Sequence, residues 1–70
     1  FYFDEKPLGE IMQELSHWYE FNVVFEKESL KQRKFTIETS RYENIDQVLK
    51  LIEETHVVKC RKEGKTIYIQ

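Results

Sequence analysis

Two stretches of the chain repeat apolar residues at the spacing of a helix face. The positions i, i+3, i+4 and i+7 are occupied by Leu8, Ile11, Met12 and Leu15 in the first stretch, and by Ile45, Val48, Leu49 and Ile52 in the second. This spacing predicts two amphipathic helices. Asn44 is a suitable N-cap for the second helix, whereas Lys6, Pro7 and Gly9 give the first helix a locally weak start that must rely on packing. Trp18 continues the first stripe, so we expect it in the core.

Five shorter segments have the composition and alternation of strands, namely residues 1–3, 21–25, 35–39, 58–61 and 66–69. Their outward and inward positions alternate with a period of two, as strand side chains do. Glu63 and Gly64 lie between the last two segments and predict a tight hairpin turn. Residues 26–34 are charged and contain one apolar residue, Leu30, which indicates a loop or a short helical turn.

The two halves of the chain repeat one another. A shift of 37 residues carries the first helical stripe onto the second, Phe21 onto Val58 and Val23 onto Cys60. We therefore expect two β-α-β units followed by one extra hairpin strand, in the order β-α-β-β-α-β-β. Each helix has one narrow apolar stripe, so each needs a sheet to cover it. The predicted fold class is α+β.

The same patterns predict which residues form the core. The expected core consists of Leu8, Ile11, Met12, Leu15, Phe21, Val23, Phe35, Ile37, Ile45, Val48, Leu49, Ile52, Val58, Cys60, Ile67 and Ile69. Cys60 is expected to point inward and to act as a small apolar residue.

Length and charge limit the possible functions. Seventy residues form one small domain, here residues 1–70, and the chain begins at Phe1, so we expect it to be a piece of a longer protein. Its 11 basic and 13 acidic residues give a net charge of −2, which disfavours nucleic acid as a partner. The single cysteine excludes an internal disulfide, and no apolar run approaches the roughly 20 residues needed to span a bilayer.

The sequence lacks the motifs of common catalytic and cofactor sites. His17, His56 and Cys60 do not have the paired spacing of a structural zinc site. No glycine-rich phosphate loop and no GxSxG turn are present. We therefore expect no enzyme activity, no cofactor, no metal and no small-molecule substrate.

A few exposed features could bind a protein. Residues 31–34 with Lys27 form the one basic cluster, which is more typical of a solvated loop than of an anion-binding patch. Tyr2, Tyr42 and Tyr68 either alternate outward from core neighbours or lie in a loop. Aromatic side chains at a surface often anchor partners, so these three tyrosines are the candidate protein-interaction residues.

Several stretches together resemble a known family. They are the aromatic strand before Pro7-Leu8, the pair Trp18-Tyr19, the segment 21–25, the Asn44-capped helix and the final glycine-containing hairpin. This combination resembles the C-terminal domain of FecR-family anti-sigma factors, especially of the Bacteroidetes type, and is similar to the STN module found at the N-terminus of secretins and TonB-dependent receptors. The resemblance implies two helices between a two-stranded and a three-stranded sheet. The chain departs from the broader STN pattern where a glycine often ends each helix, because Tyr19-Glu20 and Thr55-His56 stand there instead.

The resemblance also implies a function. FecR-type proteins cross the inner membrane once, and a different part of the same protein binds an extracytoplasmic-function sigma factor. The domain would lie in the periplasm and recognise the N-terminal signalling domain of an outer-membrane TonB-dependent transporter.

Three alternatives remain open from the sequence. One is the signalling (STN) domain of the transporter itself. Another is a nucleic-acid module, although the GxxG loop of a KH domain is absent. The third is an accessory domain of an enzyme.

Overall fold

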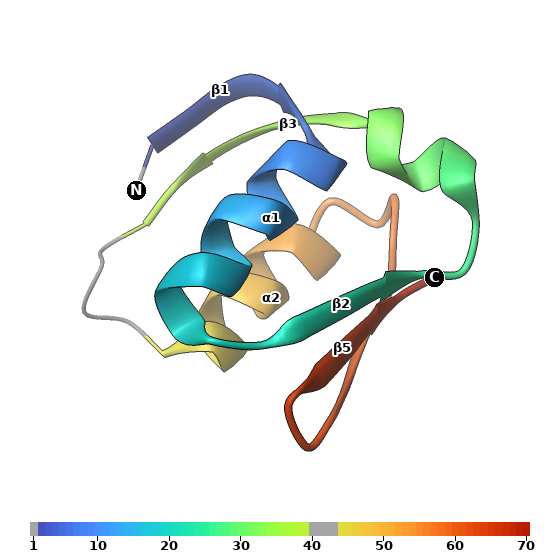
Figure 1. Ribbon diagram of the computed structural model, residues 1–70. Coiled ribbons are helices and arrows are strands. Elements are labelled where there is room, and N and C mark those ends of the chain that lie inside the picture. Colours follow the sequence, from blue (N-terminus) through green and yellow to red (C-terminus); the bar gives the residue numbers. More distant parts are fainter. Residues whose placement is uncertain (1, 40–43) are drawn as a thin grey trace.

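The computed structural model describes residues 2–39 and 44–70, which form two sheets with two helices between them (Figure 1). The two-stranded sheet pairs β1 (Tyr2–Pro7) with β3 (Lys34–Glu38) in antiparallel fashion. The three-stranded sheet has the order β2 (Asn22–Phe25), β5 (Thr66–Ile69), β4 (Cys60–Glu63), with β2 parallel and β4 antiparallel to β5. The helices are α1 (Leu8–Tyr19) and α2 (Ile45–Glu53), and a short 3-10 helix, η1 (Glu28–Gln32), lies between β2 and β3. This arrangement confirms the expected fold class and element order.

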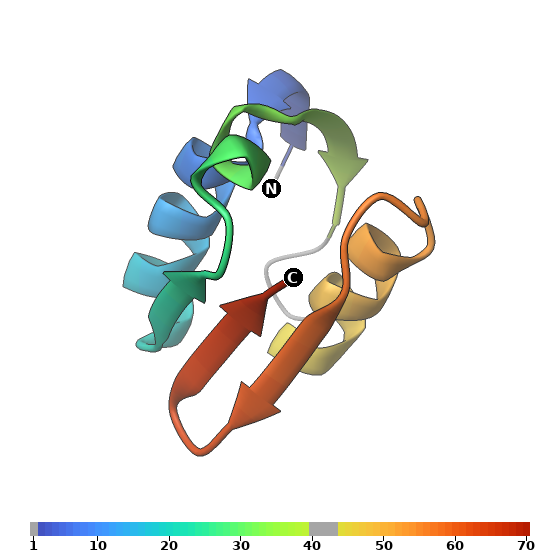
Figure 2. The same ribbon diagram turned by 90° about the vertical axis from the view of Figure 1, so that its right-hand side faces the viewer.

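The sequence repeat has a structural counterpart. The units β1-α1-β2 and β3-α2-β4 each place their first strand in the two-stranded sheet and their second strand at an edge of the three-stranded sheet. Strand β5 lies between those two edges. Figure 2 shows the two helices on opposite sides of the molecule, with the β4-β5 hairpin below them.

The core lies between the sheets and is built mainly from the two predicted stripes. Its buried apolar residues are Phe3, Leu8, Ile11, Met12, Leu15, Phe35, Ile37, Val48, Leu49, Ile52, Val58, Ile67 and Ile69. Four residues of the expected core, Phe21, Val23, Ile45 and Cys60, are only partly buried but pack against this cluster. Phe3 was not in the predicted set and is 2% exposed.

The two helices begin in different ways. Asn44 caps α2 as predicted, because its side-chain oxygen accepts a hydrogen bond from the Gln47 N–H at 3.0 Å. The residue before α1 is Pro7, which makes no side-chain cap. Instead, the Leu8 N–H donates to the Arg33 carbonyl at 2.7 Å, and the Leu8 side chain is fully buried. The weak start of α1 is thus supported by packing, as expected.

Trp18 does not lie in the core, so that prediction was wrong. Its side chain is 51% exposed, whereas Tyr19 packs partly against the core. The reason is the helical period: Tyr19, four residues after Leu15, lies near the middle of the buried stripe, whereas Trp18 lies to one side of it. Glu20 then takes a left-handed conformation with φ 57° that ends α1.

The hairpin turn is also shifted by one residue from the predicted position. Strands β4 and β5 pair Glu63 with Thr66, so the two turn residues are Gly64 and Lys65 rather than Glu63 and Gly64. Gly64 has φ 59°. A positive φ at the first turn position is what a type II′ hairpin requires, and glycine adopts it without strain.

Candidate protein-interaction surface

The outer face of the three-stranded sheet carries a row of three paired side chains. Val24 on β2 pairs with Tyr68 on β5, and Tyr68 pairs with Arg61 on β4. Ile67 and Ile69 point into the core, so strand alternation places Tyr68 on the opposite, solvent-facing side. Val24 is 42% exposed. The outer-face row therefore combines an aliphatic, an aromatic and a cationic group.

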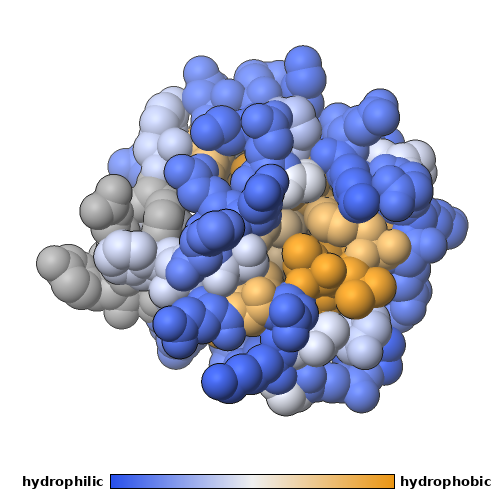
Figure 3. All heavy atoms as spheres, in the orientation of Figure 1, coloured by the Kyte–Doolittle hydropathy of each residue, from blue (hydrophilic) through white to orange (hydrophobic). Residues whose placement is uncertain are grey.

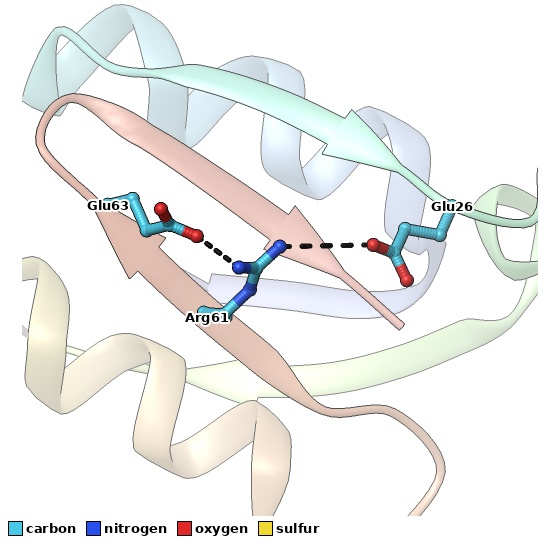
Figure 4. A network of polar contacts seen from close by, with 3 residues as sticks. All are labelled: Glu26, Arg61 and Glu63. Atoms are coloured by element: carbon cyan, nitrogen blue, oxygen red, sulfur yellow. Dashed lines mark hydrogen bonds and ion pairs between the residues drawn. The ribbon is translucent and has the colours of Figure 1, made fainter.

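Arg61 is held in place by its neighbours. Its guanidinium lies 4.5 Å from the centre of the Tyr68 ring, within the range of a cation–π interaction. It also pairs with Glu63 on the same strand and lies 4.0 Å from Glu26 at the end of β2, as Figure 4 shows. These ion pairs are about half exposed, so they add little to stability. Their effect is to order a patch that offers both an aromatic surface and charges of both signs.

The three tyrosines proposed from the sequence do not form one site. Tyr68 lies in the outer-face row, as its alternation predicts. Tyr2 is 65% exposed on β1, in the other sheet and on the far side of the helix layer (Figure 1). Tyr42 lies outside the described residues. A role in binding stays a prediction for all three.

Two apolar residues, Trp18 and Val24, are exposed although the sequence analysis did not name them as surface residues. Trp18 lies to one side of the buried stripe of α1, although it follows Leu15 by three residues. Val24 did carry a signal, because it occupies an outward position between Val23 and Phe25, where a polar residue is the usual choice.

The basic cluster is spread over η1 and the start of β3. Lys31 pairs with Glu28 at 3.2 Å, and its ammonium group lies 5.7 Å from the centre of the Phe25 ring. Arg33 uses its carbonyl to support the start of α1, and its side chain is exposed together with that of Lys34. Lys31 is thus a packing residue rather than part of a free cationic patch.

Cys60 is half-buried at the start of β4, and its side chain packs against the core. Burial, together with the nearby charge of Glu53, raises the pKa of Cys60 from its ordinary value of 9.0 to about 12. The Cys60 N–H donates to the Glu53 carboxylate at 3.3 Å. A thiol with a raised pKa is a poor nucleophile near neutral pH, so Cys60 is better suited to packing than to chemistry.

Two open cavities lie beside the three-stranded sheet. One, of about 580 Å³, is found where Lys27, Glu53, His56 and Lys59 come together at the end of the sheet. The other, of about 500 Å³, lies between β2 and α1. Within residues 2–39 and 44–70, no group of three or more His, Cys, Asp or Glu side chains could hold a metal ion. None of the helices in the described part of the chain is long and apolar enough to cross a membrane.

Comparison with known proteins gives one family and two related structures. The family described as "FecR, C-terminal" matches residues 1–69. Two crystal structures of a proposed anti-sigma factor from Parabacteroides distasonis have the same fold, with TM-scores of 0.85 and 0.84 at 20% sequence identity over 100% and 99% of this chain. The chain spans about one third (32%) of the length of that protein. No curated protein matches the chain significantly.

Proposed function

Because the chain belongs to the FecR C-terminal family, we propose that it is the part of an anti-sigma regulator that recognises a partner protein and not an enzyme. The proposed partner is the N-terminal signalling domain of a TonB-dependent outer-membrane transporter. A different part of the same regulator binds the sigma factor. In this proposal the domain lies in the periplasm and is attached to a single inner-membrane span. The family match over nearly the whole chain carries the proposal.

The surface supports protein recognition in particular. The outer-face row presents Val24, Tyr68 and Arg61 side by side, and tyrosine and arginine are the residue types that most often dominate binding energy at interfaces. Both charge signs are present within the row and its two glutamates, which suits a protein contact better than a polyanion. A domain of this size offers roughly 800 Å² to a partner at most, so the contact is expected to be modest in area.

The family match also favours this function over one alternative. The matched family is the C-terminal part of FecR and not a transporter. This match favours the regulator over the signalling domain of the transporter itself.

A titration tests the proposal. The isotope-labelled chain is titrated with the signalling domain of the transporter encoded beside it, and in parallel with an unrelated DNA duplex. We expect chemical-shift changes that cluster on the three-stranded sheet and are weakened by Tyr68→Ser more than by the matched variant Tyr2→Ser on the other sheet. Strongly salt-dependent binding to DNA, with none to the transporter domain, would refute the proposal.

A further inference from the structure

The two edges of the three-stranded sheet occupy equivalent places in the repeat, yet their polar groups are arranged differently. In the second unit, two contacts join α2 to the edge strand β4. The Cys60 N–H donates to Glu53 at 3.3 Å, and Lys62 pairs with Asp46 at 2.9 Å. The Lys59–Gln70 pair hydrogen-bonds in both directions, so alternation directs the backbone groups of Cys60 and Lys62 away from β5 and towards this outer edge. The helix therefore covers one backbone group of this edge, the Cys60 N–H, and an ion pair between side chains joins it to the same strand.

The first unit lacks both of these contacts. The same shift of 37 residues relates Glu53 to Ser16 and Cys60 to Val23, and it relates Asp46 to Gly9 and Lys62 to Phe25. The Ser16 hydroxyl donates to the Gln13 carbonyl of its own helix at 2.7 Å, and Gly9 has no side chain. Gly9 also packs closely on η1, because an added Cβ would lie 3.2 Å from the Lys31 Cβ.

The edge of β2 consequently keeps exposed backbone groups. Asn22 and Glu26 donate their N–H groups to the carbonyls of Lys65, just before β5, and Ile69 in β5, at 2.7 and 3.0 Å. In a parallel ladder the alternate residues face the other way, so the N–H and C=O groups of Val23 and Phe25 point away from β5. Among the described residues, no side chain makes a hydrogen bond to them.

A cavity follows this open edge. Its lining includes Val23 and Phe25 on the strand side and Gly9, Gln13 and Ser16 on the helix side, around about 500 Å³. Figure 3 shows a hydrophobic patch over β2 that is surrounded by hydrophilic side chains. The two charged lining residues, Glu10 and Lys31, have opposite signs, so the lining has no net charge.

We propose that the free edge of β2 binds an extended segment of the transporter's signalling domain, which adds as a fourth strand to the three-stranded sheet. This inference rests on the proposed function. An extended backbone is the chemical complement of the unpaired N–H and C=O groups of Val23 and Phe25, and strand addition obtains its affinity from such main-chain hydrogen bonds. The neutral cavity beside the edge would take a small, uncharged side chain of the added strand. Val24 would then lie directly beside the new strand on the outer face, with Tyr68 one strand further in.

The repeat itself supplies the variant that tests this inference. Ser16→Glu places a carboxylate where Glu53 stands in the second unit and should cover the Val23 N–H. Its controls are His17→Glu, which adds the same charge to an exposed site outside the cavity, and Glu53→Ser, which uncovers the opposite edge. Ser16→Gln supplies an uncharged acceptor and separates covering of the edge from charge. Each variant is first shown to fold by its thermal unfolding transition.

We expect Ser16→Glu and Ser16→Gln to weaken binding to the signalling domain by about tenfold or more, as loss of one or two main-chain hydrogen bonds predicts. His17→Glu and Glu53→Ser should change binding by less than about threefold. Unchanged binding by both Ser16 variants would overturn the edge inference while the proposed function stands. Absence of binding by the unaltered chain would overturn both. Self-association of the chain alone that Ser16→Glu abolishes would assign the edge to a second copy and also overturn the inference.

Discussion

The two β-α-β units share their apolar positions but differ at the junction between helix and edge strand. In the unit that contains α2, Glu53 and Asp46 reach across to β4; in the unit that contains α1, Ser16 bonds within its own helix and leaves β2 uncovered. The comparison separates two tasks of the sequence. Apolar residues determine where the strands and helices pack, whereas a few polar residues determine which strand edge keeps exposed backbone groups.

Covering an edge has a general physical benefit. An exposed strand edge presents unpaired backbone groups that invite pairing with other chains. Strand β1 of the other sheet is interrupted by a register shift between Phe3 and Lys6, and such irregularities hinder regular pairing at an edge. Within the three-stranded sheet, the described residues place a helix side chain on the edge of β4 and none on the edge of β2.

The largest expected effect tests whether the apolar stripes of the two helices pack into one shared core. Leu15 and Ile52 are equivalent in the repeat and both are fully buried. Leu15→Ala and Ile52→Ala should each lower the free energy of unfolding by about 2–5 kcal/mol, because each leaves a cavity in the same core. Denaturant unfolding measures both. A loss below about 1 kcal/mol for either variant would show that its helix does not pack as described.

A smaller effect is expected where the two helices end. Glu20 and His56 adopt left-handed conformations, with φ 57° and 61°, in the places where the broader STN pattern often has glycine. Glu20→Gly and His56→Gly should each stabilise the domain by about 1 kcal/mol, since glycine avoids the steric cost of this conformation. Thermal unfolding checks this, with Glu54→Gly as the control. Glu54 is in the right-handed region, so its replacement by glycine should destabilise the domain. Destabilisation by both test variants would contradict the expectation.

The smallest expected effect concerns the thiol of Cys60 on the edge strand β4. The folded-state pKa of Cys60 is raised to about 12, so the unfolded chain loses this proton first. The contribution of Cys60 to stability should therefore be complete below about pH 9 and should fall as the pH rises towards 12. Alkylation in the folded state should be slow at neutral pH and fast in denaturant.

The variant Glu53→Gln tests whether Glu53 contributes to the raised pKa of Cys60. It removes the charge that adds to burial but keeps an acceptor for the Cys60 N–H, so the pKa of Cys60 should fall and alkylation should become faster. Lys59→Gln is a control that changes a charge next to Cys60 without touching this contact. Equal alkylation rates for Glu53→Gln and the unaltered chain would show that Glu53 does not act on the thiol.

Much of the fold was predictable because it follows from local periodicity. The stripes on α1 and α2, the Asn44 cap and the inward positions of Ile67 and Ile69 all depend on neighbours in the sequence. Trp18 was misplaced because the spacing after Leu15 admits both Trp18 and Tyr19, and only Tyr19 lies near the middle of the stripe at the period of a helix. The position of the hairpin turn depends on the pairing of Glu63 with Thr66, because glycine can occupy either position of a two-residue turn.

The candidate site was less predictable for a similar reason. Alternation gave the outward position of Tyr68, but the partners of Tyr68 depend on the sheet order. Insertion of β5 between β2 and β4 brings Val24 and Arg61 to either side of it. The same order makes β2 and β4 the two edges of the sheet. The difference between Ser16 and Glu53 can therefore be interpreted only when the sheet order is known.

Amide hydrogen exchange at Val23 and Cys60, with and without the signalling domain, tests the central claim most directly. In the free chain, the Val23 N–H should exchange faster than the Cys60 N–H, because only the latter is covered by a helix side chain. On binding, exchange at Val23 and Phe25 should slow by about tenfold or more, as new backbone hydrogen bonds predict, while exchange at Cys60 stays unchanged. Binding that leaves Val23 and Phe25 unprotected, or that protects Cys60 instead, would contradict the account.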